Sequence, residues 1–337
     1  MAAIEIGAAT RRLYDESLVW DNTLPWVEGF TDDHTLPRFH AAGIDAISLT
    51  VNALDGSAVR TVKHIGAVKK YLRDNAETMV QVLSVDDLGR AKAEGKLALM
   101  LNLQETDVLE GRLDMIQVYY DLGVRHMLLA YNRKNKVGDG CAERTDGGLS
   151  RFGIHVVEEM NRVGMIVDGS HTGYRTSMEA IEVSSAPVIF SHCSAQALYD
   201  HYRNIRDDQI KACAASGGVI GMNGMGEFTD DDQAGSETLF RQVDHVAQLV
   251  GPAHVSIGLD YVEATEAFWG WVRVDDEAWP WNNGQPHREA RFAAPEQIVE
   301  VTELMLRAGF GDDDVRGFLG ENLIRVAGEV WKAPGRP

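Results

Sequence analysis

The sequence predicts an α/β protein that folds as a single (β/α)₈ TIM-type barrel with a C-terminal helical extension. Three observations support this fold class. Eight short apolar or β-branched runs recur along the chain, longer amphipathic stretches separate them, and 337 residues are enough for one such barrel. Apolar runs that alternate with helical patterns are typical of parallel strands joined by crossover helices. We therefore expect one domain that spans residues 1–337.

The eight apolar runs are the predicted strands. They are the segments 17–22, 45–51, 97–103, 125–131, 165–170, 187–192, 218–223 and 254–260. Clear helical patterns occupy residues 150–164, 238–251 and 295–309, and the last of these has a proline in its first turn, as helix starts prefer. Residues 312–332 predict two further helical segments, separated at Gly320, that close the barrel from outside.

Two stretches depart from this alternation. A long helical excursion at residues 57–95 precedes the third strand. After the eighth strand, residues 261–294 contain four tryptophans and the sequence Asn-Asn-Gly, which predicts a long, irregular, Trp-rich loop on the rim. Such a loop is commonly a lid or a subunit contact, and simple packing over the barrel mouth is the alternative.

Composition and charge exclude several classes of partner. The formal net charge is −19, and no basic stripe is present to neutralise a phosphate backbone, so we expect no nucleic-acid partner. No stretch approaches the roughly 20 apolar residues of a membrane span, and charges near the start precede any signal-peptide core. The three cysteines lack C-x-x-C spacing, so no disulfide framework is indicated. These features predict a cytoplasmic protein without a membrane partner.

Candidate functional residues gather at the predicted strand ends. In a barrel of this kind the reactive side chains lie at the C-terminal ends of the strands, because the βα loops form one rim there. Polar residues of the type that bind metals or move protons occur at six of the eight ends. They are Asp21, Gln104 with Glu105, Tyr131, His171, His192 and Asp260.

The two histidines suggest a metal site. A single histidine at a strand end is more often structural, but His171 and His192 follow neighbouring strands, so both imidazoles could bind one ion at the roughly 2.0–2.1 Å of a zinc–nitrogen bond. Asp260 could then move a proton between water and a leaving amine. Arg203, in the loop after the sixth strand, suits a substrate carboxylate, and a surface salt bridge with Asp200 or Asp207 is the alternative.

A family resemblance rests on two long runs of sequence. They read GLSRFGIHVVEEMNRVGMIVDGSHTG and SSAPVIFSHCSAQALYDHYRNIRDDQIKACAASGGVIGMN. Together with DNTLPW, LGVRHMLLAYNRKN and GENLIRVAGEVW, they cover most of the chain and resemble the membrane dipeptidase (renal dipeptidase) family of the amidohydrolase superfamily. The resemblance implies a zinc-dependent (β/α)₈ hydrolase that cleaves dipeptides at a binuclear site. By motif it makes His171 and His192 metal ligands, Arg203 the clamp for the substrate's C-terminal carboxylate, and Asp260 the acid/base.

Other positions depart from the family's pattern. The first-strand His-x-Asp motif reads Asp21-Asn22-Thr23, and the bridging glutamate of the third strand appears as Gln104, unless a one-residue shift brings Glu105 inward. An amide and a hydroxyl bind Zn²⁺ far more weakly than a carboxylate and an imidazole. We therefore expect one Zn²⁺ per chain, at His171 and His192, completed by Asp21, Gln104 or water.

Three functions remain open at this point. The leading hypothesis is a metal-dependent hydrolase that cleaves the amide bond of a dipeptide or a similar small carboxylate, with Tyr131 facing the substrate in place of the family's histidine. The second is a metal-poor or metal-free enzyme that uses Asp260, Tyr131 and Asp21 in an elimination or isomerisation. The third is a binding protein without catalysis. Exposed tryptophans on the rim are compatible with a homodimer.

Overall fold

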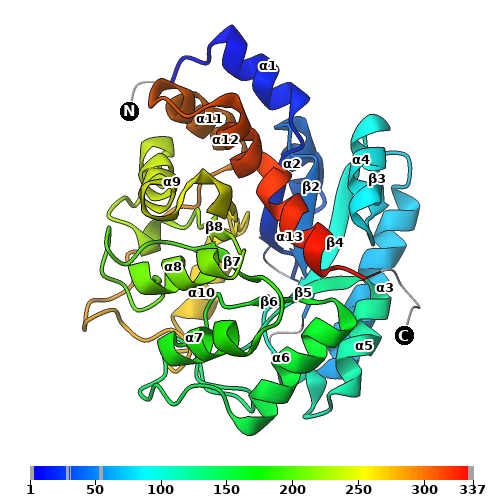
Figure 1. The fold of residues 1–337 in the computed structure, drawn as a ribbon, viewed down its shortest axis with the longest axis vertical. Helices are drawn as coiled ribbons and strands as arrows, with labels where there is room; N and C mark the ends of the chain where they lie inside the picture. Colours follow the sequence, from blue (N-terminus) through cyan, green and yellow to red (C-terminus); the bar gives the residue numbers. More distant parts are fainter. Residues whose placement is uncertain (1–3, 28–29, 31, 53–55, 333–337) are drawn as a thin grey trace.

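Eight parallel strands close into a barrel in the computed structural model, which describes residues 4–27, 30, 32–52 and 56–332 (Figure 1). The strands follow one another around the ring in sequence order, and pairing of β2 with β4 and of β1 with β9 completes it. The barrel strands are β1 (Trp20–Pro25), β2 (Ala46–Thr50), β4 (Leu97–Leu103), β5 (Val124–Leu128), β6 (Ile166–Asp168), β7 (Val188–Cys193), β8 (Ile220–Met222) and β9 (Val255–Ile257).

All eight predicted strands are confirmed, and one further strand was missed. β3 (Met79–Gln81) lies within the predicted helical excursion, between α3 (Ala58–Asp74) and α4 (Val85–Ala93). It pairs only with the first residues of β4, below the point where β5 joins the same strand. Three residues are too few to show a period of two, so the sequence pattern could not reveal β3.

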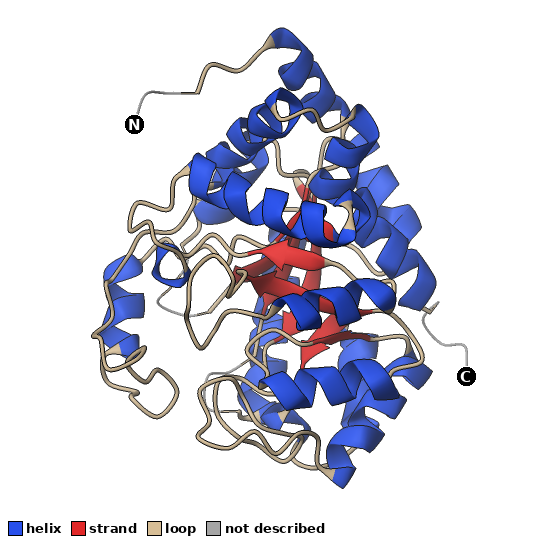
Figure 2. Cartoon of the chain, turned by 60° about the vertical axis from the view of Figure 1, so that its left-hand side comes forward, coloured by secondary structure: helices blue, strands red, loops and turns tan. Residues whose placement is uncertain are grey.

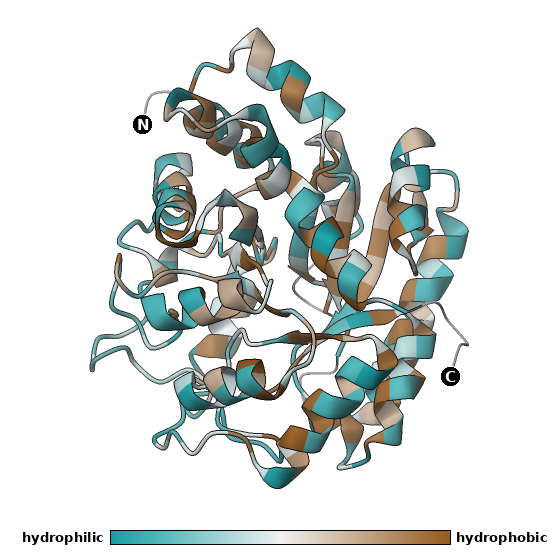
Figure 3. Cartoon of the chain, viewed as in Figure 1, coloured by the Kyte–Doolittle hydropathy of each residue, from teal (hydrophilic) through white to brown (hydrophobic). Residues whose placement is uncertain are grey.

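Helices surround the barrel, with the strands at the centre (Figure 2). Their apolar sides face the strands and their polar sides face outward (Figure 3). The predicted helix at 150–164 is α6, which begins after Ser150, whose hydroxyl accepts a hydrogen bond from the Gly153 amide. α6 spans Arg151–Val163. The other helices around the barrel are α1 (Ala8–Glu16), α2 (Thr35–Ala41), α5 (Asp114–Leu122), α7 (Tyr174–Val183), α8 (Asp207–Ala215), α9 (Ser236–Val250) and α11 (Ile298–Arg307). Short helical turns are η1 (Asp107–Leu109), η2 (Gly226–Phe228), η3 (Pro252–His254) and η4 (Pro295–Gln297).

The C-terminal extension is one nearly continuous helical run. It comprises α12 (Asp312–Arg316), a π turn η5 (Gly317–Glu321) and α13 (Asn322–Val330), so the two predicted α-helical segments are present and are joined by a π turn that contains Gly320. Gly320 is required because a Cβ there would lie 2.4 Å from the Leu18 carbonyl oxygen. Apolar side chains of α13 pack against the first residues of several strands and cover that end of the barrel.

The Trp-rich segment 261–294 is partly helical, which corrects the prediction of an irregular loop. It contains α10 (Thr265–Val272), and two of its tryptophans, Trp269 and Trp279, are buried. Trp281, in contrast, is 62% exposed. Burial of the Trp269 and Trp279 rings stabilises the folded segment 261–294, although its sequence contains mainly turn signals. Across the described residues, no helix has the length and apolar character that crossing a membrane requires.

Strands β7, β8 and β9 approach each other unusually closely at the Ser191 carbonyl. A Cβ at Gly221 of β8 would lie 1.9 Å from that oxygen, and a Cβ at Gly258, just after β9, would lie 2.0 Å from it. No side chain fits at either distance, so both positions require glycine. The close packing brings the C-terminal ends of these strands together at the rim.

Gly221→Ala is expected to lower the free energy of unfolding by about 1–3 kcal/mol, because the added methyl group overlaps the β7 backbone. Chemical denaturation measures this change. Gly328→Ala is the matched control, since Gly328 is exposed in α13 with no neighbouring atom within 4 Å, and it should be neutral or stabilising by up to about 1 kcal/mol. Equal stability of the two variants would contradict the tight contact at Ser191.

Candidate active and metal-binding site

Three predicted site residues converge at the rim of the barrel. His171, His192 and Asp260 follow or end β6, β7 and β9, and one ligand atom from each lies within 4.8 Å of the others. The two imidazole Nε2 atoms are 3.0 Å apart, and His192 Nε2 lies 3.9 Å from Asp260 Oδ2. β6 and β7 are hydrogen-bonded neighbours, as the sequence predicted. Within the described residues, this is the one group of three such side chains that could share an ion.

The backbone at these positions is strained. His171 has φ +59° and Asp260 has φ +53°, in the left-handed region that side chains other than glycine seldom adopt. Such a conformation costs about 1–3 kcal/mol and persists only where the surroundings fix it. Hydrogen bonds from the Cys141 amide to the His171 carbonyl, at 2.7 Å, and from the Asp260 amide to the Thr23 carbonyl, at 3.1 Å, hold both residues.

Each imidazole is oriented through its Nδ1 atom. Asn132 Oδ1 lies 2.6 Å from His171 Nδ1, and the Asn132 amide donates in turn to the Ala278 carbonyl at 2.9 Å. His192 Nδ1 lies 2.6 Å from the Ser191 hydroxyl, which donates a short hydrogen bond to the Asp168 carboxylate. These contacts place the protons on Nδ1 and leave both Nε2 lone pairs directed at a common point.

Electrostatics favours neutral imidazoles. Burial, together with the Arg203 cation, holds the pKa values of His171 and His192 well below 6.5. Burial raises the pKa of Asp260 to about 7, although Arg203 opposes the shift. The site therefore holds two imidazoles in the form that binds metals and one carboxyl that can gain or lose a proton near neutral pH.

Asp21 does not join the group of three. The predicted strand 17–22 placed Asp21 at a strand end. In the structure β1 extends to Pro25, so Asp21 lies inside the strand. Its Oδ1 accepts hydrogen bonds from the amides of Leu259 and Thr23, at 3.0 and 3.3 Å. Burial raises the pKa of Asp21 to about 7, and its Oδ2 has no hydrogen-bond partner in the described part of the chain.

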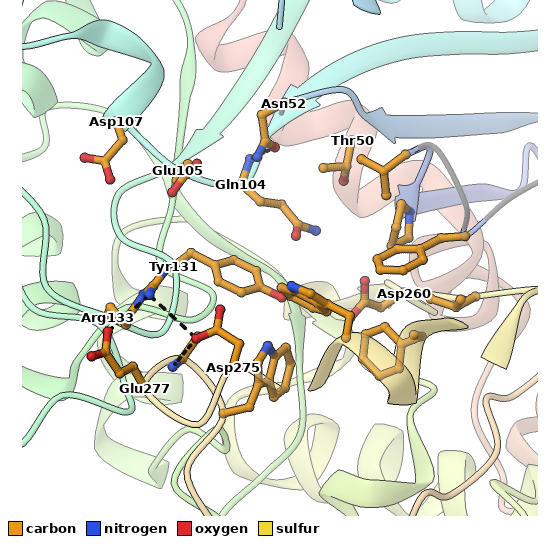
Figure 4. Close-up of a pocket in the computed structure, with 18 of the residues that line it drawn as sticks. Thr50, Asn52, Gln104, Glu105, Asp107, Tyr131, Arg133, Asp260, Asp275 and Glu277 are labelled. Atoms are coloured by element: carbon orange, nitrogen blue, oxygen red, sulfur yellow. Dashed lines mark hydrogen bonds and ion pairs between the residues drawn. The ribbon is translucent and has the colours of Figure 1, made fainter. Parts of the chain in front are cut away.

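Gln104, and not Glu105, points toward the centre of the site. Figure 4 shows the Gln104 amide directed toward the space between Tyr131 and Asp260, whereas Glu105 lies on the side of Asp107. The Gln104 backbone amide donates to Asn52 Oδ1 at 2.8 Å, which fixes the chain at this strand end. A one-residue shift that would bring Glu105 inward is therefore absent from the structure.

Tyr131 covers one face of His171. The two rings stack with centroids 4.0 Å apart and an interplanar angle of 22°. The Trp279 ring makes T-shaped contacts with both rings. Its centroid lies 6.0 Å from that of Tyr131 and 6.3 Å from that of His171. Burial raises the pKa of Tyr131 well above its ordinary value, so its hydroxyl stays protonated and can donate a hydrogen bond.

Arg203 is a buried cation, so the alternative of a surface salt bridge is wrong. The side chain is only 2% exposed, and its guanidinium donates to Cys193 Sγ at 3.2 Å and to the His192 carbonyl at 2.9 Å. No described carboxylate lies within ion-pair distance of it, and its Nε has no hydrogen-bond partner among the described atoms. A buried guanidinium without a carboxylate is poised to accept an anion.

Two cavities border this group. One has a volume of about 360 Å³ and is lined by Asp260, Tyr131 and Gln104 (Figure 4). The other has a volume of about 310 Å³ and is lined by His171 and Arg203. Tyr131 lines the first cavity and His171 the second, and the stacking of the two rings places the cavities on opposite sides of this pair.

The residues that orient the histidines were missed by the sequence analysis. Asn132, Asp168 and Ser191 were not among the predicted site residues, although Ser191 stands immediately before His192 in the sequence. Asp168 is buried, and contacts with His126 and Ser191 hold its pKa below the usual range although burial alone would raise it. Asp168 is three residues from His171 in sequence yet acts on His192, so only the fold reveals this connection.

The donor set fits a zinc ion. Two imidazole nitrogens and one carboxylate oxygen are common ligands of Zn²⁺, and three protein ligands leave a fourth position for a substrate or water. Asn132 and the Ser191–Asp168 pair supply the outer hydrogen bonds that ligating histidines usually make. The Thr23 hydroxyl and the Gln104 amide bind Zn²⁺ more weakly than a carboxylate or an imidazole does.

Comparison with curated proteins finds fungal dipeptidases. An uncharacterized dipeptidase of Schizosaccharomyces pombe is 31% identical over 254 residues, which cover 73% of this chain and 55% of the relative. The dipeptidase aclJ of Aspergillus oryzae is 29% identical over 277 residues, which cover 80% of this chain and 61% of the relative. This chain therefore spans little more than half the length of these relatives.

Solved structures share the fold over nearly the whole chain. An amidohydrolase from Pseudomonas aeruginosa superposes with a TM-score of 0.86 at 30% identity and covers 96% of this chain and 99% of its own. A metallopeptidase from Rhodobacter sphaeroides, solved with a phosphinate mimic of a dipeptide, superposes with a TM-score of 0.76 at 17% identity, covering 94% and 100%, which shows the fold alone. The model of the family named membrane dipeptidase, peptidase family M19, matches residues 32–277, and this chain belongs to that family.

Proposed function

We propose that this protein is a metal-dependent hydrolase that cleaves the amide bond of a dipeptide or a similar small carboxylate-bearing amide, with one zinc ion per chain. One observation carries the proposal: His171, His192 and Asp260 converge on one point beside Arg203, a buried cation without a carboxylate partner. Family membership and the names of the fungal relatives support the same activity.

Each residue has a distinct role in the proposed reaction. A zinc ion held by His171, His192 and Asp260 would supply Lewis-acid chemistry at the amide carbonyl. The Asp260 carboxylate takes a proton from the attacking water and gives it to the leaving amine. Arg203 binds the substrate carboxylate, and Tyr131 donates a hydrogen bond toward the amide from its position over His171.

A second candidate is a metal-free elimination or isomerisation on a small carboxylate. It is favoured by one observation, since Asp21 and Asp260 are both buried carboxyl groups whose pKa values burial raises to about 7. Two such groups could act as acid and base without a metal. The cytoplasmic location and the homodimer remain predictions.

Metal content separates these two candidates. Elemental analysis of the zinc-reconstituted protein should find about one zinc per chain. His171→Asn should lose it, and asparagine tolerates the left-handed backbone at this position, so the fold should persist. His155→Asn, at a residue whose side chain is 62% exposed, is the control and should keep the ion. A wild-type protein that is active with no bound metal would exclude the hydrolytic proposal.

Asp260→Asn tests the proton transfer. It should lower kcat by roughly 10²–10⁴-fold, since the amide cannot accept the proton. The melting temperature should stay close to that of the wild type, because asparagine also adopts φ near +53°. Asp276→Asn, at an exposed position of the same rim segment, provides the control. Zinc content is measured alongside, and unchanged turnover in the loaded variant would remove Asp260 from the mechanism.

Arg203→Lys tests the carboxylate clamp. Lysine keeps the charge but loses the planar pair of donors, so KM for a dipeptide should rise by about 10–100-fold, as expected for loss of a charged hydrogen bond. The same dipeptide with an amidated C-terminus should be a poor substrate for the wild type and should respond little to the substitution. An equal effect on both substrates would show that Arg203 serves the fold alone.

A further inference from the structure

A continuous wall of aromatic rings lines the 360 Å³ cavity. Phe268 contacts Phe30 at 5.7 Å and Trp279 at 5.9 Å between ring centroids. Trp271 lies 5.6 Å from Trp279 and 6.4 Å from Tyr131. All five rings line the cavity, and four of them come from segments far apart in the sequence from Tyr131. Rings in edge-to-face contact present an apolar, shaped surface to a ligand.

The wall lies on a defined side of the proposed reaction centre. Asp260 and Tyr131 line the same cavity as the rings, whereas Arg203 lines the other cavity, beyond His171. A substrate whose carboxylate reaches Arg203 and whose amide lies at His171 and Asp260 must place its remaining part in the aromatic cavity. For a dipeptide, that part is the residue that supplies the scissile carbonyl.

The two basic residues of the cavity lining have acidic partners. Arg133 lies 3.6 Å from Asp275 and 3.5 Å from Glu277, and these pairs join the loop after β5 to the Trp-rich segment. Lys134 pairs with Asp139 at 3.0 Å. Glu105 and Asp107 also line the cavity, so its polar side is acidic (Figure 4). The aromatic wall is the apolar surface that the cavity offers to a substrate side chain.

We infer that the substrate has an aromatic or large apolar side chain on the residue that supplies the scissile carbonyl. The inference rests on the proposed function for the orientation of the substrate. The cavity, with a volume of about 360 Å³, has room for an aromatic side chain. Trp271 and its neighbours would then determine specificity without taking part in proton transfer.

The test compares dipeptides that differ only at the first residue. Phe-Ala, Leu-Ala, Lys-Ala and Gly-Ala share the carboxylate that Arg203 would bind. We expect kcat/KM for Phe-Ala to exceed that for Gly-Ala by about 10–100-fold, the range for burial of one large apolar group. Lys-Ala, whose side chain would depend on the acidic groups of the lining, should be a poorer substrate than Phe-Ala. Equal or better turnover of Gly-Ala or Lys-Ala would overturn the inference.

A matched pair of tryptophan variants locates the effect. Trp271→Ala should reduce the ratio of kcat/KM for Phe-Ala over Gly-Ala by about 10-fold, because it removes one ring from the cavity wall. Trp281→Ala changes an exposed tryptophan of the same segment and should preserve the ratio. If both variants change the ratio equally, the wall does not determine specificity.

A binding measurement keeps this inference separate from the proposed function. Calorimetry on metal-free wild-type protein compares Phe-Ala with Gly-Ala in the absence of turnover. Tighter binding of Phe-Ala that depends on Trp271, in a protein whose zinc-loaded form hydrolyses no dipeptide, would support the cavity assignment and refute the hydrolase. Hydrolysis of all four dipeptides at similar rates, with equal binding, would refute the cavity assignment and leave the hydrolase standing.

Discussion

The structure depends on one tight contact, at the peptide carbonyl of Ser191 on β7. Gly221 and Gly258 approach this oxygen so closely that neither position has room for a side chain. The approach gathers β7, β8 and β9, so that Thr23 of β1 comes within 3.4 Å of His192 Nδ1. The Ser191 hydroxyl meanwhile joins Asp168 to that imidazole. One residue thus connects closure of the barrel with the orientation of a candidate metal ligand.

The buried Arg203 links the two halves of the site electrostatically. Its charge helps to keep His171 and His192 unprotonated, which is the state in which imidazole binds a metal. Burial of a guanidinium is unfavourable unless its donors are satisfied, and here a carbonyl, a thiol and the ring of Phe228, 5.5 Å away, provide only neutral partners. Under the proposed function a substrate carboxylate would complete this environment, and the same guanidinium favours neutral imidazoles at the candidate metal site.

The sequence predicted the barrel well because strands and helices of this fold have distinct periodicities. All eight barrel strands were identified, and His171, His192 and Asp260 were expected on one rim from the position of strand ends alone. The failures have physical causes. β3 is too short to show a period, and the helical part of 261–294 is stabilised by burial of its rings, which local sequence does not encode. The sequence left two interpretations of Arg203 open, a carboxylate clamp and a surface salt bridge. Only the folded chain shows that Arg203 is buried, which excludes the surface salt bridge.

The changed ligand positions on β1 acquire a structural role in this chain. Asp21 accepts a hydrogen bond from the Leu259 amide, and the Thr23 carbonyl accepts one from the Asp260 amide. Both bonds join β1 to the turn that follows β9. This turn holds Asp260 in its left-handed conformation and aims the carboxylate at His192. Asp21 and Thr23 therefore brace the turn that carries the Asp260 carboxylate beside the two histidines.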